Sequence, residues 1–257
     1  MIVKIKLVFV TLMMASALWA VSYTEVFANR INVKKYVEDP FASEEDRERK
    51  FLNKVNPDGT LKYPDVWYKK GARYYYGLDG EGINFRKAYE YWTPPAKEGH
   101  KEATYGMGLL RFNGRGITKD YGGAMHWFLK AHEAGHPEAA YYLGVIHFEG
   151  TDVEKKDYDK AREWFEKGVK SGDQRAAYAL GLLYYNGNGV EQSYENAHIL
   201  WQQIAERGNS EAQYSLGTMY ETGQGVEQNM EEALRWYKMA KEQGHLEAHR
   251  AYNELSQ

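Results

Sequence analysis

Residues 176–212 read AAYALGLLYYNGNGVEQSYENAHILWQQIAERGNSEA, and closely related stretches precede and follow them. An alanine opens each copy, and successive alanines lie 36, 37, 36 and 36 residues apart: Ala103, Ala139, Ala176, Ala212 and Ala248. A fixed period of this size is typical of stacked helical hairpins, which bury their apolar faces against their neighbours. The spacing therefore predicts an all-α solenoid and not one globular core.

The first half of each copy has apolar and aromatic residues at helical spacing. A glycine recurs as the sixth residue: Gly108, Gly144, Gly181 and Gly217. Because glycine costs about 1 kcal/mol relative to alanine inside a helix, its recurrence indicates a close contact between helices. A further glycine is expected to end this first helix: Gly114, Gly150, Gly187 or Gly223.

The second half of each copy begins with a residue suited to capping a helix: Asp120, Asp157, Ser193 or Asn229. The helix is expected to end near Gly135, Gly172, Gly208 or Gly244. A tryptophan stands three or four residues after a second recurring alanine: Trp127, Trp164, Trp201 or Trp236. Because the period of these tryptophans matches the repeat, we expect them to pack between hairpins and not to form a ligand cage.

The recurring pattern A-x-Y-x-L-G…G-x-G-V…A-x-x-x-W…G-x-x-x-A resembles the Sel-one-like repeat (SLR) family, which is related to the tetratricopeptide repeats. The resemblance covers residues 103–248 and extends back to about Trp67. It implies a right-handed α-solenoid of stacked helix-turn-helix repeats that serves as a scaffold or adaptor. Bacterial members of the family are often exported.

The N-terminal residues 1–28 have the pattern of a secretory signal. Lys4 and Lys6 precede an apolar run too short for a typical membrane span, and cleavage is expected after Ala28 or Ala20. The alternative is an uncleaved N-terminal anchor. Either outcome predicts that the repeats lie outside the cytoplasm, in the periplasm or secreted.

Four full repeats are expected over 103–138, 139–175, 176–211 and 212–247, followed by a capping helix over 248–257. Before them, residues 67–102 are expected to form a degenerate first repeat. Its second helix should end or kink near Trp92, because Pro94 and Pro95 interrupt it.

Residues 29–66 do not share the repeat. They are expected to form a leader with one charged helix, from Ser43 to Val55, and a turn over 56–59. The leader either covers the first hairpin or acts as a tether.

The charges nearly balance, with 33 Lys and Arg against 36 Asp and Glu and a net charge of −3. This balance does not favour a nucleic acid or an anionic membrane surface as partner. The chain has no cysteine, which excludes disulfides, cysteine nucleophiles and thiolate metal sites. We therefore expect no membrane contact beyond the signal segment, no cofactor and no metal. We also expect a monomer.

The stretch from His132 to His136 spells H-E-A-G-H, which matches the zinc motif H-E-x-x-H. A zinc-dependent hydrolase is therefore an alternative function. Against it, Gly135 is expected to end the helix, so His132 and His136 should not share a regular turn. The sequence suggests no third ligand, and we expect no catalytic residue.

The resemblance implies that the first helix of each hairpin lines a concave groove. Aromatic side chains on a rigid groove favour recognition of a protein or peptide. The candidate partner-binding residues are Tyr105, Arg111, Phe112, Tyr141, His147, Phe148, Glu149, Tyr178, Tyr185, Tyr214 and Glu221. The alternative is that the tyrosines only pack hairpin against hairpin.

These features favour an exported scaffold that docks a protein or peptide in its groove. One version is an immunity or inhibitor protein that occupies a secreted toxin, and another is an adaptor for assembly of an envelope complex. A peptidoglycan or glycan binder that uses aromatic stacking is a further alternative.

Overall fold

The computed structural model describes residues 49–151 and 155–256. The expected signal over 1–28 and most of the leader lie outside the described residues. The chain divides into two compact units, residues 1–63 and 64–257. In the described part, helices are the regular elements and pairing between extended segments is limited to one isolated bridge.

The described part of the first unit contains helical residues 49–52 followed by a turn. The Gly59 amide donates to the carbonyl of Asn56 at 2.9 Å, and Gly59 has a φ of +85°. The predicted turn over 56–59 is therefore confirmed. The expected charged helix stops before Val55, because Val55 pairs with Leu61 in the antiparallel bridge that this turn closes.

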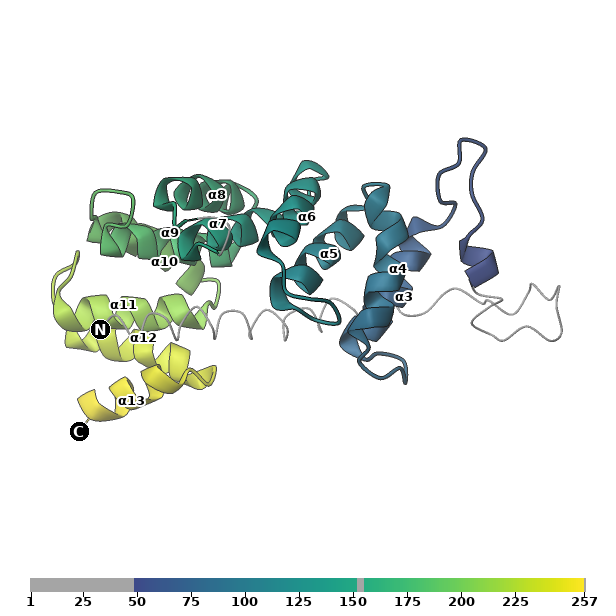
Figure 1. Cartoon of the computed structure of the whole chain (residues 1–257). Coiled ribbons are helices and arrows are strands. Elements are labelled where there is room, and N and C mark those ends of the chain that lie inside the picture. The colour runs from purple at the N-terminus through teal and green to yellow at the C-terminus, as the bar shows by residue number, and fades with distance from the viewer. Residues whose placement is uncertain (1–48, 152–154, 257) are drawn as a thin grey trace. The chain divides into compact units, whose positions relative to one another are not determined.

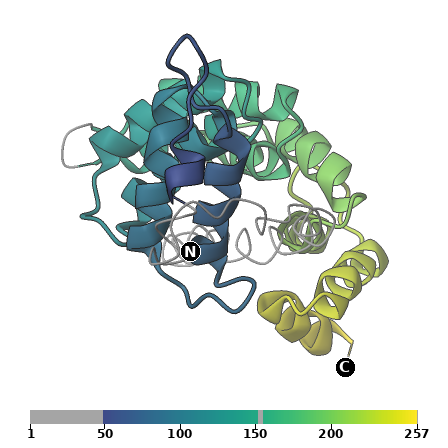
Figure 2. The ribbon, with the colours of Figure 1, turned by 90° about the vertical axis from the view of Figure 1, so that its right-hand side faces the viewer.

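The second unit is a row of helical hairpins that follow one another in chain order (Figure 1). Seen from the end, this row is curved (Figure 2). The helices are α3 (Pro64–Tyr76), α4 (Phe85–Lys97), α5 (Lys101–Asn113), α6 (Tyr121–Glu133), α7 (Ala139–Glu149), α8 (Tyr158–Lys170), α9 (Gln174–Asn186), α10 (Tyr194–Ala205), α11 (Ser210–Thr222), α12 (Met230–Glu242) and α13 (Leu246–Leu255). The predicted α-solenoid is confirmed. None of these helices is long and apolar enough to cross a membrane.

Every second helix in the row has the side-chain cap that the sequence predicts. The side chains of Asp120, Asp157 and Ser193 each accept an amide of the first helical turn, at 2.8–3.2 Å. Asn84 and Asn229 cap α4 and α12 in the same way. These caps fix where each hairpin turns, because they satisfy amides that the helix leaves free.

Each hairpin is held closed by an aromatic ring of its second helix that lies against the recurring glycine of its first helix. We call these rings the interhelical aromatics: Trp92, Phe128, Phe165, Trp201 and Tyr237. They face, in the same order, Gly71, Gly108, Gly144, Gly181 and Gly217. A Cβ atom on any of these glycines would lie under 3 Å from the ring, which explains why alanine does not replace them.

The prediction that all four tryptophans pack inside is confirmed for Trp201 and Trp236, which are buried, and wrong for Trp127 and Trp164, which are partly exposed. The inward position is four residues after the recurring alanine of the second helix, and Trp127, Trp164 and Trp236 stand only three after it. One residue turns a helix by about 100°, so these side chains do not point at the glycine of the first helix. Trp127 and Trp164 are partly exposed, whereas Trp236 is buried but is not the ring that faces the glycine.

A second glycine in the loop sets the distance between successive hairpins. Gly116, Gly189 and Gly225 have φ angles of 68–74°, a conformation that residues with side chains avoid. They lie directly against the first residue of the preceding second helix, which is Phe85, Tyr158 or Tyr194 respectively. The 37-residue interval arises from one extra residue between Gly150 and Asp157, where residues 152–154 are outside the described part.

The expectation that Pro94 and Pro95 end or kink α4 near Trp92 is wrong, because the helix continues to Lys97. Both prolines lie in its last turn, so few backbone hydrogen bonds are lost. Trp92, Pro95 and Ala96 are buried, and this packing stabilises the helical backbone through the proline pair.

Substitutions of the neighbouring residues Trp164 and Phe165 distinguish the packing in the structure from the packing predicted from the sequence. Phe165 is fully buried against Gly144, and Phe165→Ala should lower the free energy of unfolding by about 3–5 kcal/mol because it leaves a cavity. Trp164→Ala should cost about 1 kcal/mol, because the ring is partly exposed. Urea unfolding followed by circular dichroism measures both. The reverse order would contradict the assignment.

Candidate functional site: a polar network across three repeats

One position near the start of the first helices departs from the repeat in a single copy. The residue just before the repeat alanine is acidic in four copies: Glu102, Glu138, Glu211 and Glu247. Arg175 occupies this place in the remaining copy. An acidic residue near a helix N-terminus stabilises the helix dipole and a basic one opposes it, so Arg175 requires another explanation.

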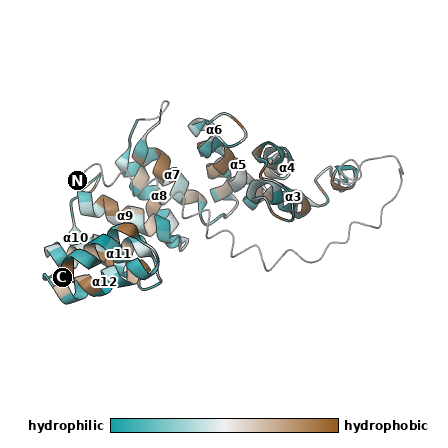
Figure 3. Cartoon of the chain, turned by 90° about the horizontal axis from the view of Figure 1, so that it is seen from below, coloured by the Kyte–Doolittle hydropathy of each residue, from teal (hydrophilic) through white to brown (hydrophobic). Residues whose placement is uncertain are grey.

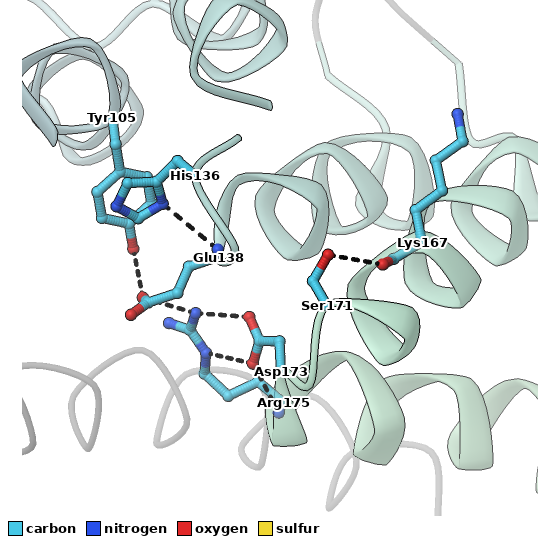
Figure 4. A network of polar contacts seen from close by, with 7 residues as sticks. All are labelled: Tyr105, His136, Glu138, Lys167, Ser171, Asp173 and Arg175. Atoms are coloured by element: carbon cyan, nitrogen blue, oxygen red, sulfur yellow. Dashed lines mark hydrogen bonds and ion pairs between the residues drawn. The ribbon is translucent and has the colours of Figure 1, made fainter. Parts of the chain in front are cut away.

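Arg175 and Tyr105 meet on one carboxylate (Figure 4). The Tyr105 hydroxyl donates to Oε2 of Glu138 at 2.8 Å, and Nη2 of Arg175 donates to the same oxygen at 2.8 Å. Burial raises the pKa of Tyr105 well above its ordinary value, so the hydroxyl keeps its proton and remains a donor. These two bonds connect α5 and α9 through Glu138, which precedes α7.

Arg175 also forms an ion pair with Asp173 at the start of the same helix, α9. Its Nε and Nη2 donate to the two carboxylate oxygens of Asp173 at 3.0 and 2.7 Å, while Asp173 caps α9 by accepting the Arg175 amide. The guanidinium lies 4.7 Å from the centroid of the Tyr141 ring. Burial alone would lower the pKa of Arg175, but Asp173 holds it well above its ordinary value. The charge of Arg175 is therefore permanent.

His136 completes the network. Its ring stacks on Tyr105 with centroids 3.9 Å apart and planes 13° apart, and its Nδ1 accepts the Glu138 amide at 3.3 Å. We call Tyr105, His136, Glu138, Asp173 and Arg175 the junction network. Burial lowers the pKa of His136 to about 4, so the imidazole is neutral at physiological pH.

The recurring tyrosines are used at the junctions between repeats. Tyr105 belongs to the junction network, and Tyr141 lies beneath Arg175 and is 2% exposed. Tyr178 is 3% exposed, with its hydroxyl 3.2 Å from Ser215 of the next first helix. Tyr214 stacks on His245 with centroids 4.7 Å apart. Each tyrosine thus contacts the next first helix or the residues that directly precede it. Whether any of them also touches a partner stays a prediction.

The other candidates from α5 are engaged with their own hairpin. Nη1 of Arg111 donates to Asp120, the cap of α6, at 2.9 Å. Phe112 is 4% exposed and packs edge-on against Tyr121 and Phe128.

The remaining candidates lie where α7, α9 and α11 end. His147 is buried, Phe148 is partly buried beside Tyr158, and Glu149 is exposed. Tyr185 is partly buried and donates to Gln224 of the following loop. Glu221 accepts a hydrogen bond from Tyr237, the interhelical aromatic of its hairpin.

The two histidines of the H-E-x-x-H motif are separated as the glycine position predicts. Helix α6 ends at Glu133, and Gly135 has a φ of +81°. His132 lies edge-on to Trp164 at 5.2 Å, whereas His136 lies on Tyr105. In the described ranges, no three His, Asp or Glu side chains are grouped so that they could hold a metal ion.

The prediction missed Glu138, Asp173 and Arg175. The signal was present in the sequence, because Arg175 is the one basic residue in an otherwise acidic repeat position. The sequence does not reveal which residue it meets, because the partner carboxylate Glu138 lies 37 positions earlier and comes close only when the repeats stack.

A family model described as the Sel1 repeat matches residues 68–100, 101–136, 137–173, 174–209 and 210–245. The crystal structure of a Sel1 repeat protein from Oxalobacter formigenes is 31% identical with a TM-score of 0.68, and the match covers 79% of this chain and 80% of that chain. The crystal structure of c5321, a protective antigen present in uropathogenic Escherichia coli strains and displaying an SLR fold, is 32% identical with a TM-score of 0.65.

The match with c5321 covers 75% of this chain and 41% of that chain, so this chain corresponds to less than half of the Escherichia coli protein. A putative Sel1 repeat protein from Klebsiella pneumoniae shares the fold at 19% identity, with a TM-score of 0.50 and coverage of 76% and 93%. No curated protein matches the chain.

Loss of Arg175 should weaken the junction between repeats. The Arg175 side chain is 15% exposed, and its removal leaves the Asp173 and Glu138 carboxylates without their shared cation. Arg175→Ala should therefore lower the free energy of unfolding by about 2–4 kcal/mol, and Arg175→Ala in a Glu138→Gln background should cost less. Exposed Arg207→Ala is the control and should change stability by less than about 0.5 kcal/mol. Equal effects of Arg175→Ala and Arg207→Ala in urea unfolding would contradict a structural role for the network.

Proposed function

Because this chain belongs to the Sel1 repeat family, we propose that it is a scaffold that binds a protein partner and does not catalyse a reaction. Proteins of this repeat family generally act as binding scaffolds. In this chain the candidate catalytic histidines are engaged separately, His132 with Trp164 and His136 with Tyr105. These contacts support binding over hydrolysis.

The binding surface that we propose is the end of the first helices nearest the loops. We define the loop-end surface as Arg111, Phe148, Glu149, Tyr185 and Glu221. The observation that carries the proposal is that two positions before the helix-ending glycine vary between copies. One position before it stand Asn113, Glu149, Asn186 and Thr222, and three positions before it stand Arg111, His147, Tyr184 and Tyr220. The position between them is aromatic in three copies and becomes Glu221 in the last. The backbone that carries them is alike in three copies, because the glycines that end α5, α9 and α11 have φ angles of 66–71° and ψ angles of 23–34°. Gly150, which ends α7, has a φ of 67° but a ψ of 171°. A constant frame with variable side chains allows specificity to be encoded without changing the fold.

Solvent exposure reduces the number of candidate partner-binding residues. Glu149 is exposed, and Arg111, Tyr185 and Glu221 are partly exposed. Phe112, Tyr141, His147 and Tyr178 are 2–6% exposed, so their contribution to binding would be to hold the frame. Tyr105 and Tyr214 are partly exposed but serve junctions between repeats.

The charges suggest the chemistry of the partner. Residues 201–257 contain five Lys and Arg against nine Asp and Glu, a net charge of −4, whereas residues 101–150 contain five of each. Aromatic side chains at Phe148 and Tyr185 alternate with the carboxylates of Glu149 and Glu221. The partner should therefore present apolar anchors together with basic side chains.

Export is part of the proposal. The sequence pattern over 1–28 supports a Sec-type signal, and the periplasm or the extracellular space is then where the partner is met. N-terminal sequencing of the protein from its native host should find a mature chain that begins at Asn29 or Val21. Retention of Met1 on a membrane-bound protein would favour the anchor instead.

Photo-crosslinking tests the loop-end surface directly. A benzoylphenylalanine residue placed at Glu149 or Tyr185 should crosslink to one protein in the envelope of the host. The same probe at exposed Glu163 on α8 should not. Glu149→Lys should weaken binding of the captured protein about tenfold, because it reverses one charge, and Glu163→Lys should leave binding unchanged.

Identification of the captured protein separates the versions of the proposal. A secreted toxin would select an immunity or inhibitor role, and a structural envelope protein would select an assembly adaptor. Crosslinking from Glu163 and Glu149 alike, or binding to a glycan array in the absence of a protein target, would contradict the proposed surface.

A further inference from the structure

We propose that the junction between α5 and α7 is an acid-sensitive joint, in which protonation of His136 loosens the attachment of one hairpin to the next. This inference concerns the fold and does not depend on whether the loop-end surface binds a protein.

The geometry around His136 requires a neutral imidazole. Helix α7 has no side-chain cap at its first turn, and Nδ1 of His136 accepts the Glu138 amide at 3.3 Å instead. Protonation would place an N–H on this nitrogen, so that two donors would face each other. The added positive charge would also lie at the N-terminal end of α7, where the helix dipole disfavours it.

Charged groups from three helices face His136, and most of the acidic ones already have partners. Lys101 and Glu102 belong to α5, Glu138 precedes α7, and Asp173 and Arg175 lie at the start of α9. Glu138 accepts hydrogen bonds from Tyr105 and Arg175, while Asp173 accepts hydrogen bonds from the Arg175 side chain and from a helix amide. The permanent charge of Arg175 and the charge of Lys101 oppose a further cation at His136.

The other histidines at helix starts differ in one respect. His100 and His245 also accept a helix amide through Nδ1, but their Nε2 atoms face carboxylates in the first turn of the preceding first helix. These are Asp65 of α3 at 3.0 Å and Glu211 of α11 at 3.2 Å. His100 and His245 therefore each lie within 4 Å of a carboxylate of another helix. Because α9 and α11 are capped by Asp173 and Asn209, the acid-sensitive arrangement is confined to the α5–α7 junction in the described array.

The direction of the pH effect follows from proton linkage. The pKa of His136 is about 4 in the folded protein and 6.5 when unfolded, mainly because burial disfavours the charged form. As the pH falls, His136 therefore becomes protonated in the unfolded chain at a higher pH than in the folded protein. The contribution of His136 to stability is complete above pH 6.5 and is lost between pH 6.5 and 4. At pH 4.5 the folding equilibrium constant should be reduced by roughly 50- to 100-fold from this residue alone.

The chain supplies its own matched replacement for His136. Asn209 caps α11 by accepting the Ala212 amide at 2.9 Å, and an asparagine does not titrate in this range. In the full chain, His136→Asn should remove most of the difference in folding constant between pH 7.5 and 4.5 that the wild type shows in urea unfolding. Exposed Arg207→Ala is the control, because arginine does not titrate in this range, and it should leave the pH dependence of the wild type unchanged.

Two measurements on the wild type keep the proposal testable if His136→Asn fails to fold. The imidazole of His136, followed by NMR, should titrate near pH 4, and titration near 6.5 would overturn the proposal. Hydrogen exchange, corrected for its intrinsic pH dependence, should show faster opening of α5 and α7 at pH 5 than at pH 7, with α11 unchanged. Uniform acceleration along the row, or identical pH dependence in wild type and His136→Asn, would also overturn it.

Discussion

The close contact between a glycine of one helix and an aromatic ring of its partner is the constraint on which the structure depends. In each of the five hairpins the ring occupies the space that a Cβ atom would need, so the two helix backbones approach closely. One face of the first helix therefore packs against the second helix of its own hairpin, and its other faces can contact neighbouring repeats. Along α7, nine successive residues from Ala139 to His147 are buried, as expected for a helix surrounded on several sides. By contrast, α11 and α12 carry many hydrophilic residues on the side seen from below (Figure 3).

Contacts between hairpins use a different set of residues, and this separation allows repeats to vary. Loop glycines such as Gly189 fix the spacing, and the tyrosines near the start of each first helix contact the next first helix or the residues that directly precede it. The junction network adds ion pairs at one position in the row, where Arg175 replaces an acidic residue. A partly buried arginine between two carboxylates favours one arrangement of three successive repeats, because removing Arg175 leaves both carboxylates without their shared cation.

The sequence predicted the repeat period, the caps and the helix-ending glycines because these depend on residues close together along the chain. In three repeats it assigned the interior position to a tryptophan, one residue too early. Phe128, Phe165 and Tyr237, which directly follow these tryptophans, occupy the inward position. It also overestimated the effect of Pro94 and Pro95, which tertiary packing overrides. The junction network was beyond reach because Tyr105, Glu138 and Arg175 are separated by 33 and 37 positions and meet only after stacking.

A double-mutant cycle on Gly108 and Phe128 tests the central contact most directly. Gly108→Ala should lower the free energy of unfolding by about 1–3 kcal/mol because the added methyl group meets the Phe128 ring, although alanine favours helix formation. With Phe128→Leu in the background, the cost of Gly108→Ala should fall by about 1 kcal/mol or more. Gly122→Ala is the matched control, because a Cβ there lies 3.6 Å from its nearest neighbour, and it should be neutral or stabilising. If Gly108→Ala behaves like Gly122→Ala, or if the two substitutions are additive, the account is contradicted.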